Sequence, residues 1–223
     1  MTLVLRRAVA ELTGTAFLVA AVVGSGIMAT RLSDDVGVQL LANSLATGAA
    51  LVALILALQP VSASFNPVVT LAERILGLID TTTAAILSSA QVVGGIVGVV
   101  VANLMFDLDA VSISTHDRSG AGLWLGEVVA TLGLVVVVFG MLRAGRGDQV
   151  AYAVAGWITA AYWFTSSTSF ANPAVTIARM FSDTFAGIAP ASVPVFVLMQ
   201  VVGGLLAVGL VRVLHPEKEK AHA

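Results

Sequence analysis

The sequence predicts an all-α membrane protein with six transmembrane helices, two shorter re-entrant half-helices and an inverted internal repeat. Three observations support this fold class: the apolar composition, the length of the apolar blocks, and the recurrence of the same motifs in both halves. Of the 223 residues, 58% are hydrophobic and 11% are charged, and the mean hydropathy is +0.98. Soluble domains carry about 25% charged residues. The composition therefore excludes a soluble globular enzyme and a disordered chain.

The apolar residues fall into six blocks that match helices crossing a membrane. A helix needs about 20 residues to cross ~30 Å of hydrocarbon, whereas a transmembrane β-barrel would show short alternating strands. The first block is too long for the apolar part of a signal peptide, so we expect a retained span. The expected spans cover residues 8–29, 37–58, 83–105, 121–142, 149–165 and 190–214.

We expect one membrane domain over residues 1–223, with repeats over about 8–105 and 121–214 and a short cytoplasmic tail, 215–223. The net charge of −2 and the lack of a basic run argue against a nucleic-acid partner. The chain has no cysteine, which excludes disulfides, thiolate metal sites and cysteine nucleophiles.

The distribution of Lys and Arg predicts that both termini are cytoplasmic, in the inner (plasma) membrane. With the N-terminus inside, only Arg31, Arg118 and Arg179 lie outside. The cytoplasmic side then holds Arg6, Arg7, Arg74, Arg143, Arg146, Arg212, Lys218 and Lys220.

The two halves of the chain contain the same landmarks in the same order. Glu11 recurs as Glu127, Asn66-Pro67 as Asn172-Pro173, and Gln91-Val-Val-Gly-Gly as Gln200-Val-Val-Gly-Gly. Each copy holds three spans, and because three is odd the second copy must be inverted. Shared features of inverted repeats lie near the midplane, so the two Asn-Pro segments are expected to enter from opposite faces and meet there.

Each Asn-Pro reads as the start of a helix, over residues 66–76 and 172–181, both too short to span a bilayer. Asn is a good N-cap and Pro is favoured at the first helical position. Two helix N-termini that face each other place partial positive charge at the midplane, which opposes cations. The segments before them, 59–65 and 165–171, would supply carbonyl acceptors along a water-filled path.

These paired motifs resemble those of the major intrinsic protein family, the aquaporins and aquaglyceroporins. The similarity runs from Glu11 to about Leu214. It implies a right-handed six-helix bundle with two half-helices, a homotetramer in the lipid bilayer, and one pore per subunit. The resemblance assigns the pore constriction to Asn66, Pro67, Val68, Asn172, Pro173 and Ala174.

The resemblance also implies a selectivity filter of four positions near the outer mouth. Counting from the motifs leaves Ala46 as an alternative for the second helix and Thr159 for the fifth. The four expected residues are Thr47, Ala160, Ser169 and Val175.

Val175 stands where family members with a narrow filter usually carry Arg. The expected filter is therefore wider and less polar, without a fixed positive charge. Arg179 lies one helical turn further on; it would partly substitute by reaching back, or else anchor the half-helix at the outer surface.

Glu11 and Glu127 are ionisable residues inside spans, which makes them functional candidates. The resemblance implies that they brace the loops before the half-helices. A proton-coupled or metal site is the other interpretation, but no His lies on those helices. The three histidines, His116, His215 and His222, do not have metal-site spacing, so no metal and no cofactor is expected.

These features favour a passive channel for small uncharged solutes: water, glycerol and metalloid hydroxides such as arsenite, as in the metalloid-conducting bacterial branch of the family. A mainly water-selective channel is the alternative. An ion-coupled transporter also uses inverted repeats and broken helices, but the two Glu are its only candidate coupling groups. An intramembrane enzyme is not expected, because there is no HExxH motif, catalytic cysteine or paired aspartate.

Overall fold

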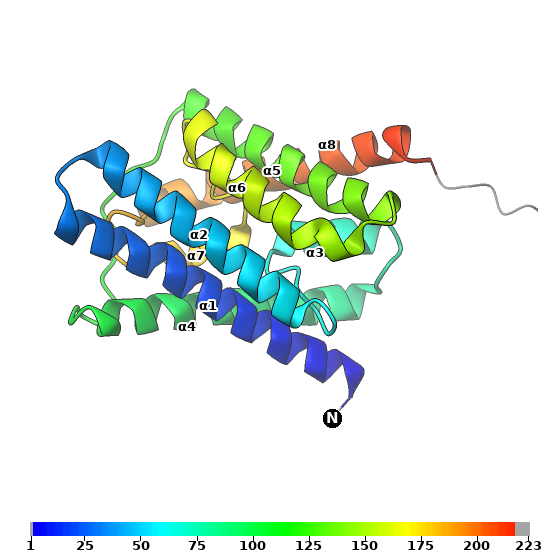
Figure 1. The fold of residues 1–223 in the computed structure, drawn as a ribbon, viewed down its shortest axis with the longest axis horizontal. Coiled ribbons are helices and arrows are strands. Elements are labelled where there is room, and N and C mark those ends of the chain that lie inside the picture. The colour runs from blue at the N-terminus through cyan, green and yellow to red at the C-terminus, as the bar shows by residue number, and fades with distance from the viewer. Residues whose placement is uncertain (1, 217–223) are drawn as a thin grey trace, which may run out of the picture.

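The computed structural model describes residues 2–216, and these residues form α-helices and two 3-10 turns with no strand. Figure 1 shows the long helices running side by side as one bundle. The expected tail is described only as far as residue 216, so Lys218, Lys220 and His222 lie outside the described residues. The helices are α1 (Leu3–Leu32), α2 (Val36–Leu58), α3 (Pro67–Ile75), α4 (Thr81–Met105), α5 (Ala121–Arg143), α6 (Val150–Phe164), α7 (Pro173–Arg179) and α8 (Val193–Leu214).

Five of the described segments are long and apolar enough to cross a membrane: α1, α2, α4, α5, and α8 with the turn before it. The remaining expected span, α6, has 15 residues and follows directly on a 3-10 turn, Gly147–Gln149. Large apolar side chains stay exposed along the outside of the bundle, including Leu45, Leu125 and Leu205. Such a surface is suited to lipid.

Short polar side chains fix where several helices begin. The Asp35 side chain accepts hydrogen bonds from the N–H groups of Gly37 and Val38 at the start of α2. Asp80 accepts a bond of 2.8 Å from the Thr83 N–H at the start of α4. These caps satisfy N–H groups that have no partner inside the helix.

The two repeats pack in the same way. Helix α1 packs against α4, and its counterpart α5 packs against α8, while α2 meets α6 between the halves. The half-helices α3 and α7 contact each other, and each packs against both α4 and α8. Figure 1 shows α3 and α7 within the bundle of longer helices. The inverted repeat thus brings both Asn-Pro segments to the centre of the molecule.

Glycines allow the closest helix contacts. A Cβ atom on Gly94 or Gly98 would collide with the α1 backbone, at the carbonyls of Leu12 and Ala16. In the second repeat, a Cβ on Gly203 would collide with the Val128 carbonyl on α5. Small residues at this spacing let helix backbones approach, and here they hold α1 to α4 and α5 to α8.

Candidate functional site

A cavity of about 310 Å³ runs along the bundle between the two repeats. The end of the cavity nearer the N-terminus of α1, called the inner end below, is lined by Arg7, Gln59 and Glu73. The opposite end, called the outer end, includes Arg179. One wall consists of the two half-helices and the non-helical segments before them. Apolar side chains of α1, α2, α5 and α6 form the opposite wall: Leu18, Val22, Leu51, Ile55, Leu134, Val138, Val154 and Ile158.

The motif asparagines Asn66 and Asn172 meet in the middle of this cavity. Nδ2 of Asn66 donates to the Ala171 carbonyl at 2.7 Å, and Nδ2 of Asn172 donates to the Phe65 carbonyl at 2.7 Å. Each Asn also caps its own half-helix, because its Oδ1 accepts the N–H of Val68 or Ala174 at 2.9 Å. An amide nitrogen has two hydrogens. One hydrogen of each Asn therefore remains for the lumen.

The two residues that follow each motif asparagine do not line the cavity. Pro67 and Pro173 occupy the first turns of α3 and α7. Val68 and Ala174 are buried and do not line the cavity. The Val68 side chain packs closely against Gly204 of α8.

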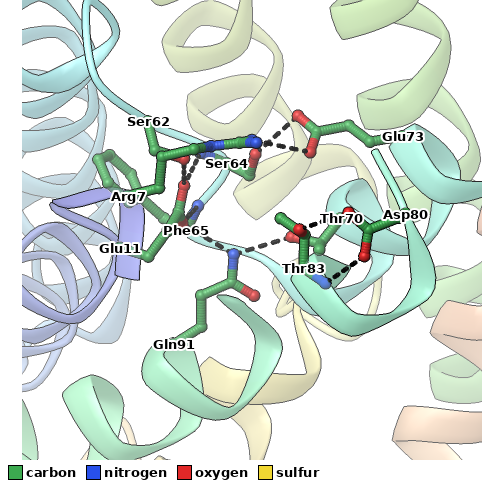
Figure 2. Close-up of polar contacts among 10 residues, drawn as sticks. All are labelled: Arg7, Glu11, Ser62, Ser64, Phe65, Thr70, Glu73, Asp80, Thr83 and Gln91. Carbon is green, nitrogen blue, oxygen red and sulfur yellow. Dashed lines mark hydrogen bonds and ion pairs between the residues drawn. The ribbon is translucent and has the colours of Figure 1, made fainter. Parts of the chain in front are cut away.

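Glu11 holds the segment that leads to α3. Its Oε1 accepts hydrogen bonds from the Ser62 hydroxyl at 2.5 Å and the Ser64 N–H at 2.9 Å. Its Oε2 accepts from the Phe65 N–H at 2.7 Å and from Gln91 Nε2 at 2.8 Å. Figure 2 shows these donors converging on the carboxylate. Four donors on one carboxyl group hold the backbone of the segment before α3 in place.

Glu127 makes the equivalent contacts in the second repeat. Its carboxylate accepts the N–H groups of Phe170 and Ala171, each at 2.9 Å, and Gln200 Nε2 at 2.5 Å. Phe65 and Ala171, which directly precede the two Asn, both have φ of 47°. Non-glycine residues rarely adopt this left-handed conformation. The glutamates thus hold two strained residues whose carbonyls receive the Asn amides.

Three of the four expected filter residues line the same cavity: Thr47, Ser169 and Val175. The Thr47 hydroxyl lies 3.1 Å from the Tyr162 hydroxyl, and both residues are buried. The Ser169 hydroxyl is buried without a hydrogen-bond partner among residues 2–216. Because this oxygen is itself buried, Ser169 lines the cavity without presenting its hydroxyl to it.

The fourth expected filter residue, Ala160, lies outside the cavity. It is exposed on the outer face of α6, in a groove that includes Tyr152 and Trp157. Its alternative, Thr159, faces Gly48 of α2. The α6 residues that line the cavity are spaced by four: Val150, Val154, Ile158 and Tyr162. The expected position, Ala160, rests on a fixed number of loop residues before Asn172. In the structure it lies between Ile158 and Tyr162, the two nearest α6 residues that line the cavity.

A cation lines the outer part of the cavity, contrary to the expected filter without positive charge. Arg179 is 3% exposed, and its Nε donates to the Ala186 carbonyl. Its guanidinium lies 3.4 Å from the centroid of the Phe170 ring, and the Arg118 guanidinium lies 5.0 Å from the same ring. Burial lowers the pKa of Arg118, in the loop after α4, to about 10. Arg118 is therefore still charged at neutral pH.

The inner end of the cavity holds an acid and a base that the sequence did not single out. Glu73 Oε1 accepts from the Ser64 hydroxyl at 2.9 Å, and Glu73 Oε2 lies 3.9 Å from Nη2 of Arg7. Figure 2 shows the Arg7 guanidinium beside the Glu73 carboxylate, close to Ser64. Glu73 could have been noticed in the sequence because it occupies the same repeat position as Arg179. Each is the seventh residue after the Asn of its motif, Asn66 or Asn172.

Comparison with known proteins decides the family. The family model described as "Major intrinsic protein" matches residues 1–149. The aquaglyceroporin AqpS of Rhizobium meliloti (strain 1021) is 49% identical over 208 residues, 93% of this chain and 89% of that protein. This chain belongs to the major intrinsic protein family. A probable aquaporin TIP2-2 of Oryza sativa subsp. japonica is 30% identical over 219 residues, 93% of this chain and 86% of that protein.

The fold of the major intrinsic proteins extends over nearly the whole chain. The X-ray structure of the aquaglyceroporin from Plasmodium falciparum matches with a TM-score of 0.73 and 16% identity, covering 96% of this chain and 98% of that one. As a member of the major intrinsic protein family, the chain is a multi-pass membrane channel for small solutes and not an enzyme. The long cavity between the repeats is the candidate pore.

Proposed function

We propose that this channel conducts small uncharged hydroxylated solutes, namely glycerol and metalloid hydroxides such as arsenous acid, together with water. The observation that supports this most directly is the two-sided wall of the cavity. One side presents the amides of Asn66 and Asn172. The opposite side is mostly apolar, with the paired hydroxyls of Thr47 and Tyr162 as its polar groups. A solute with hydroxyls on one side and an apolar body on the other is matched by such a wall.

The relative with 49% identity is named an aquaglyceroporin, which supports solutes larger than water. Val175 supports the same conclusion, since an apolar side chain lines the lumen at the expected filter position. Exclusion of cations would come from the N-termini of α3 and α7, whose partial positive charges meet at Asn66 and Asn172. We assign Glu11 and Glu127 to bracing the pore loops.

A mainly water-selective channel is the second candidate, and two residues favour it. Tyr162 and Arg179 are both bulky and both line the cavity, and the Tyr162 hydroxyl lies beside that of Thr47. Together they would narrow the lumen that Val175 leaves open. The two candidates differ in the ratio of glycerol flux to water flux.

The test is a stopped-flow panel of water, glycerol, urea and arsenous acid in proteoliposomes of the purified protein. The proposal expects glycerol and arsenous acid to cross well above protein-free vesicles, with flux linear in the gradient and unaffected by a proton uncoupler. Water flux without glycerol or arsenous acid flux would favour the water-selective candidate. Saturating, uncoupler-sensitive flux would instead indicate a coupled transporter.

We further propose that the channel lies in the inner (plasma) membrane as a homotetramer with both termini cytoplasmic. The excess of Lys and Arg on the side of the α1 N-terminus supports the orientation. The exposed apolar side chains on the outside of the bundle would face lipid or a neighbouring subunit.

A further inference from the structure

Arg179 is a buried cation with unused donors. A guanidinium has five N–H donors, and among residues 2–216 the structure gives Arg179 one acceptor, the Ala186 carbonyl. The Phe170 ring lies against its face, which adds a favourable cation–π contact. The side chain is also one of the residues that line the cavity.

The charge of Arg179 is not neutralised by an ion pair within residues 2–216. The charged groups near it are Arg118, a second cation, and Glu127. Glu127 already accepts hydrogen bonds from Phe170, Ala171 and Gln200. A buried charge without a partner is costly unless it is hydrated. The lumen is the source of that hydration, so the charge acts on whatever enters the pore.

The inverted repeat places charges at equivalent positions of both half-helices. Each half-helix lines the cavity with its first, fourth and eighth residues counted from Asn: Asn66, Val69 and Glu73 in one, and Asn172, Val175 and Arg179 in the other. Glu73 has Arg7 at 3.9 Å to offset its charge. The outer mouth therefore carries a net positive charge that the inner mouth does not match.

We propose that Arg179 is the charge-selecting residue of the outer mouth, acting from one helical turn beyond the apolar position 175. Its guanidinium repels cations and donates hydrogen bonds to the hydroxyls of an entering solute. Phe170 and the Ala186 carbonyl hold it at the pore wall. This inference rests on the proposed function, because it names the residue that selects solutes in that same pore.

The test compares Arg179→Gln, Arg179→Met and Arg179→Lys with the wild type, using cation conductance in planar bilayers and solute flux in proteoliposomes. Met is a second neutral variant whose unbranched chain can lie against the Phe170 ring. The matched control is Arg74→Gln, since Arg74 lies on α3 but is exposed, bonds Thr81 and does not line the cavity. The opposing variant is Glu73→Gln, which removes a negative charge from the inner mouth.

Removal of one unit charge from the pore wall should raise Na⁺ and K⁺ conductance by about tenfold or more in the two neutral variants. Arg179→Lys should keep cations out but change the ratio of glycerol to urea flux, because it lacks the planar fork of donors. Arg74→Gln should behave as the wild type, and Glu73→Gln should not raise cation conductance.

Wild-type cation conductance in both neutral variants, with an unchanged glycerol-to-urea ratio in Arg179→Lys, would overturn the inference. An equal rise in Arg74→Gln or Glu73→Gln would also overturn it, since the effect would not depend on Arg179. The proposed function is judged separately, by glycerol flux through the wild type. If the wild type does not conduct glycerol, the proposed function fails, but the cation conductances of the variants can still be compared with that of the wild type.

Discussion

Val175 and Arg179 lie one turn apart on the lumen side of α7 and divide the outer mouth into an apolar level and a charged level. Val175 is 5% exposed and lines the cavity, and Arg179 lines it beyond Val175. Val175 thus contributes an apolar surface to a part of the cavity that Thr47 and Ser169 also line. Under the proposed function, this combination would suit a neutral solute that is partly apolar.

Replacement of Val175 with Arg should close this level to larger solutes. The variant adds a long, always-charged side chain beside Arg179, and mutual repulsion keeps both guanidiniums hydrated in the lumen rather than packed. We expect glycerol and arsenous acid flux to fall by about tenfold or more, equivalent to roughly 1.4 kcal/mol on the barrier, with a smaller fall in water flux. Stopped-flow measurements on the same liposomes give both values.

The control for this variant is Leu78→Arg, which adds the same group at an exposed loop position away from the cavity. Unchanged glycerol and arsenous acid flux in Val175→Arg would mean that residue 175 does not line the constriction. An equal loss of water and glycerol flux would mean that the pore is plugged rather than narrowed.

At the scale of elements, the sequence predicted the half-helices and their bracing better than the face of α6. Asn66, Asn172, Glu11 and Glu127 were found because each lies in a motif that recurs in both repeats. The lumen side of α6 contains no recurring motif, and apolar residues cover both its lipid face and its lumen face, so the sequence does not distinguish the two. The distance from Asn172 along residues 165–171 does not determine which face of α6 meets the lumen, because helical periodicity does not fix the length of a loop.

Cysteine substitution on α6 distinguishes its two faces. Since the wild type has no cysteine, thiol-directed mercurials should not inhibit it. Ile158→Cys places a thiol in the cavity, whereas Ala160→Cys, two residues along, places one on the outer face. Mercurial should block most of the water flux through Ile158→Cys, reversibly by added thiol, and should leave Ala160→Cys open. If mercurial blocks Ala160→Cys and not Ile158→Cys, the face of α6 that carries Ala160 lines the lumen, as the sequence predicts.

At the scale of the whole molecule, the inverted repeat determines both the shape of the pore and its electrical asymmetry. Opposite insertion of the two copies makes α3 and α7 meet end to end, and this arrangement was predictable because an odd number of spans separates the motifs. The same operation places Glu73 at one mouth and Arg179 at the other. The chemistry of each mouth was not predictable, because residues seven positions beyond each Asn become lumen-facing only once the half-helices are packed.

The orientation of the channel decides which of these two mouths faces the cell exterior. Asp34→Cys, in the loop between α1 and α2, and Asp148→Cys, in the turn before α6, place exposed thiols at opposite ends of the bundle in a chain with no other cysteine. If the positive residues hold the termini inside, an impermeant maleimide should label Asp34→Cys in intact spheroplasts and Asp148→Cys only after lysis. The opposite pattern would place Glu73 and its Arg7 partner at the outer mouth, and labelling of both positions in intact cells would indicate that the channel inserts in two orientations. In either case passive flux would still follow the gradient, but solutes arriving from outside would no longer all meet the Arg179 cation first.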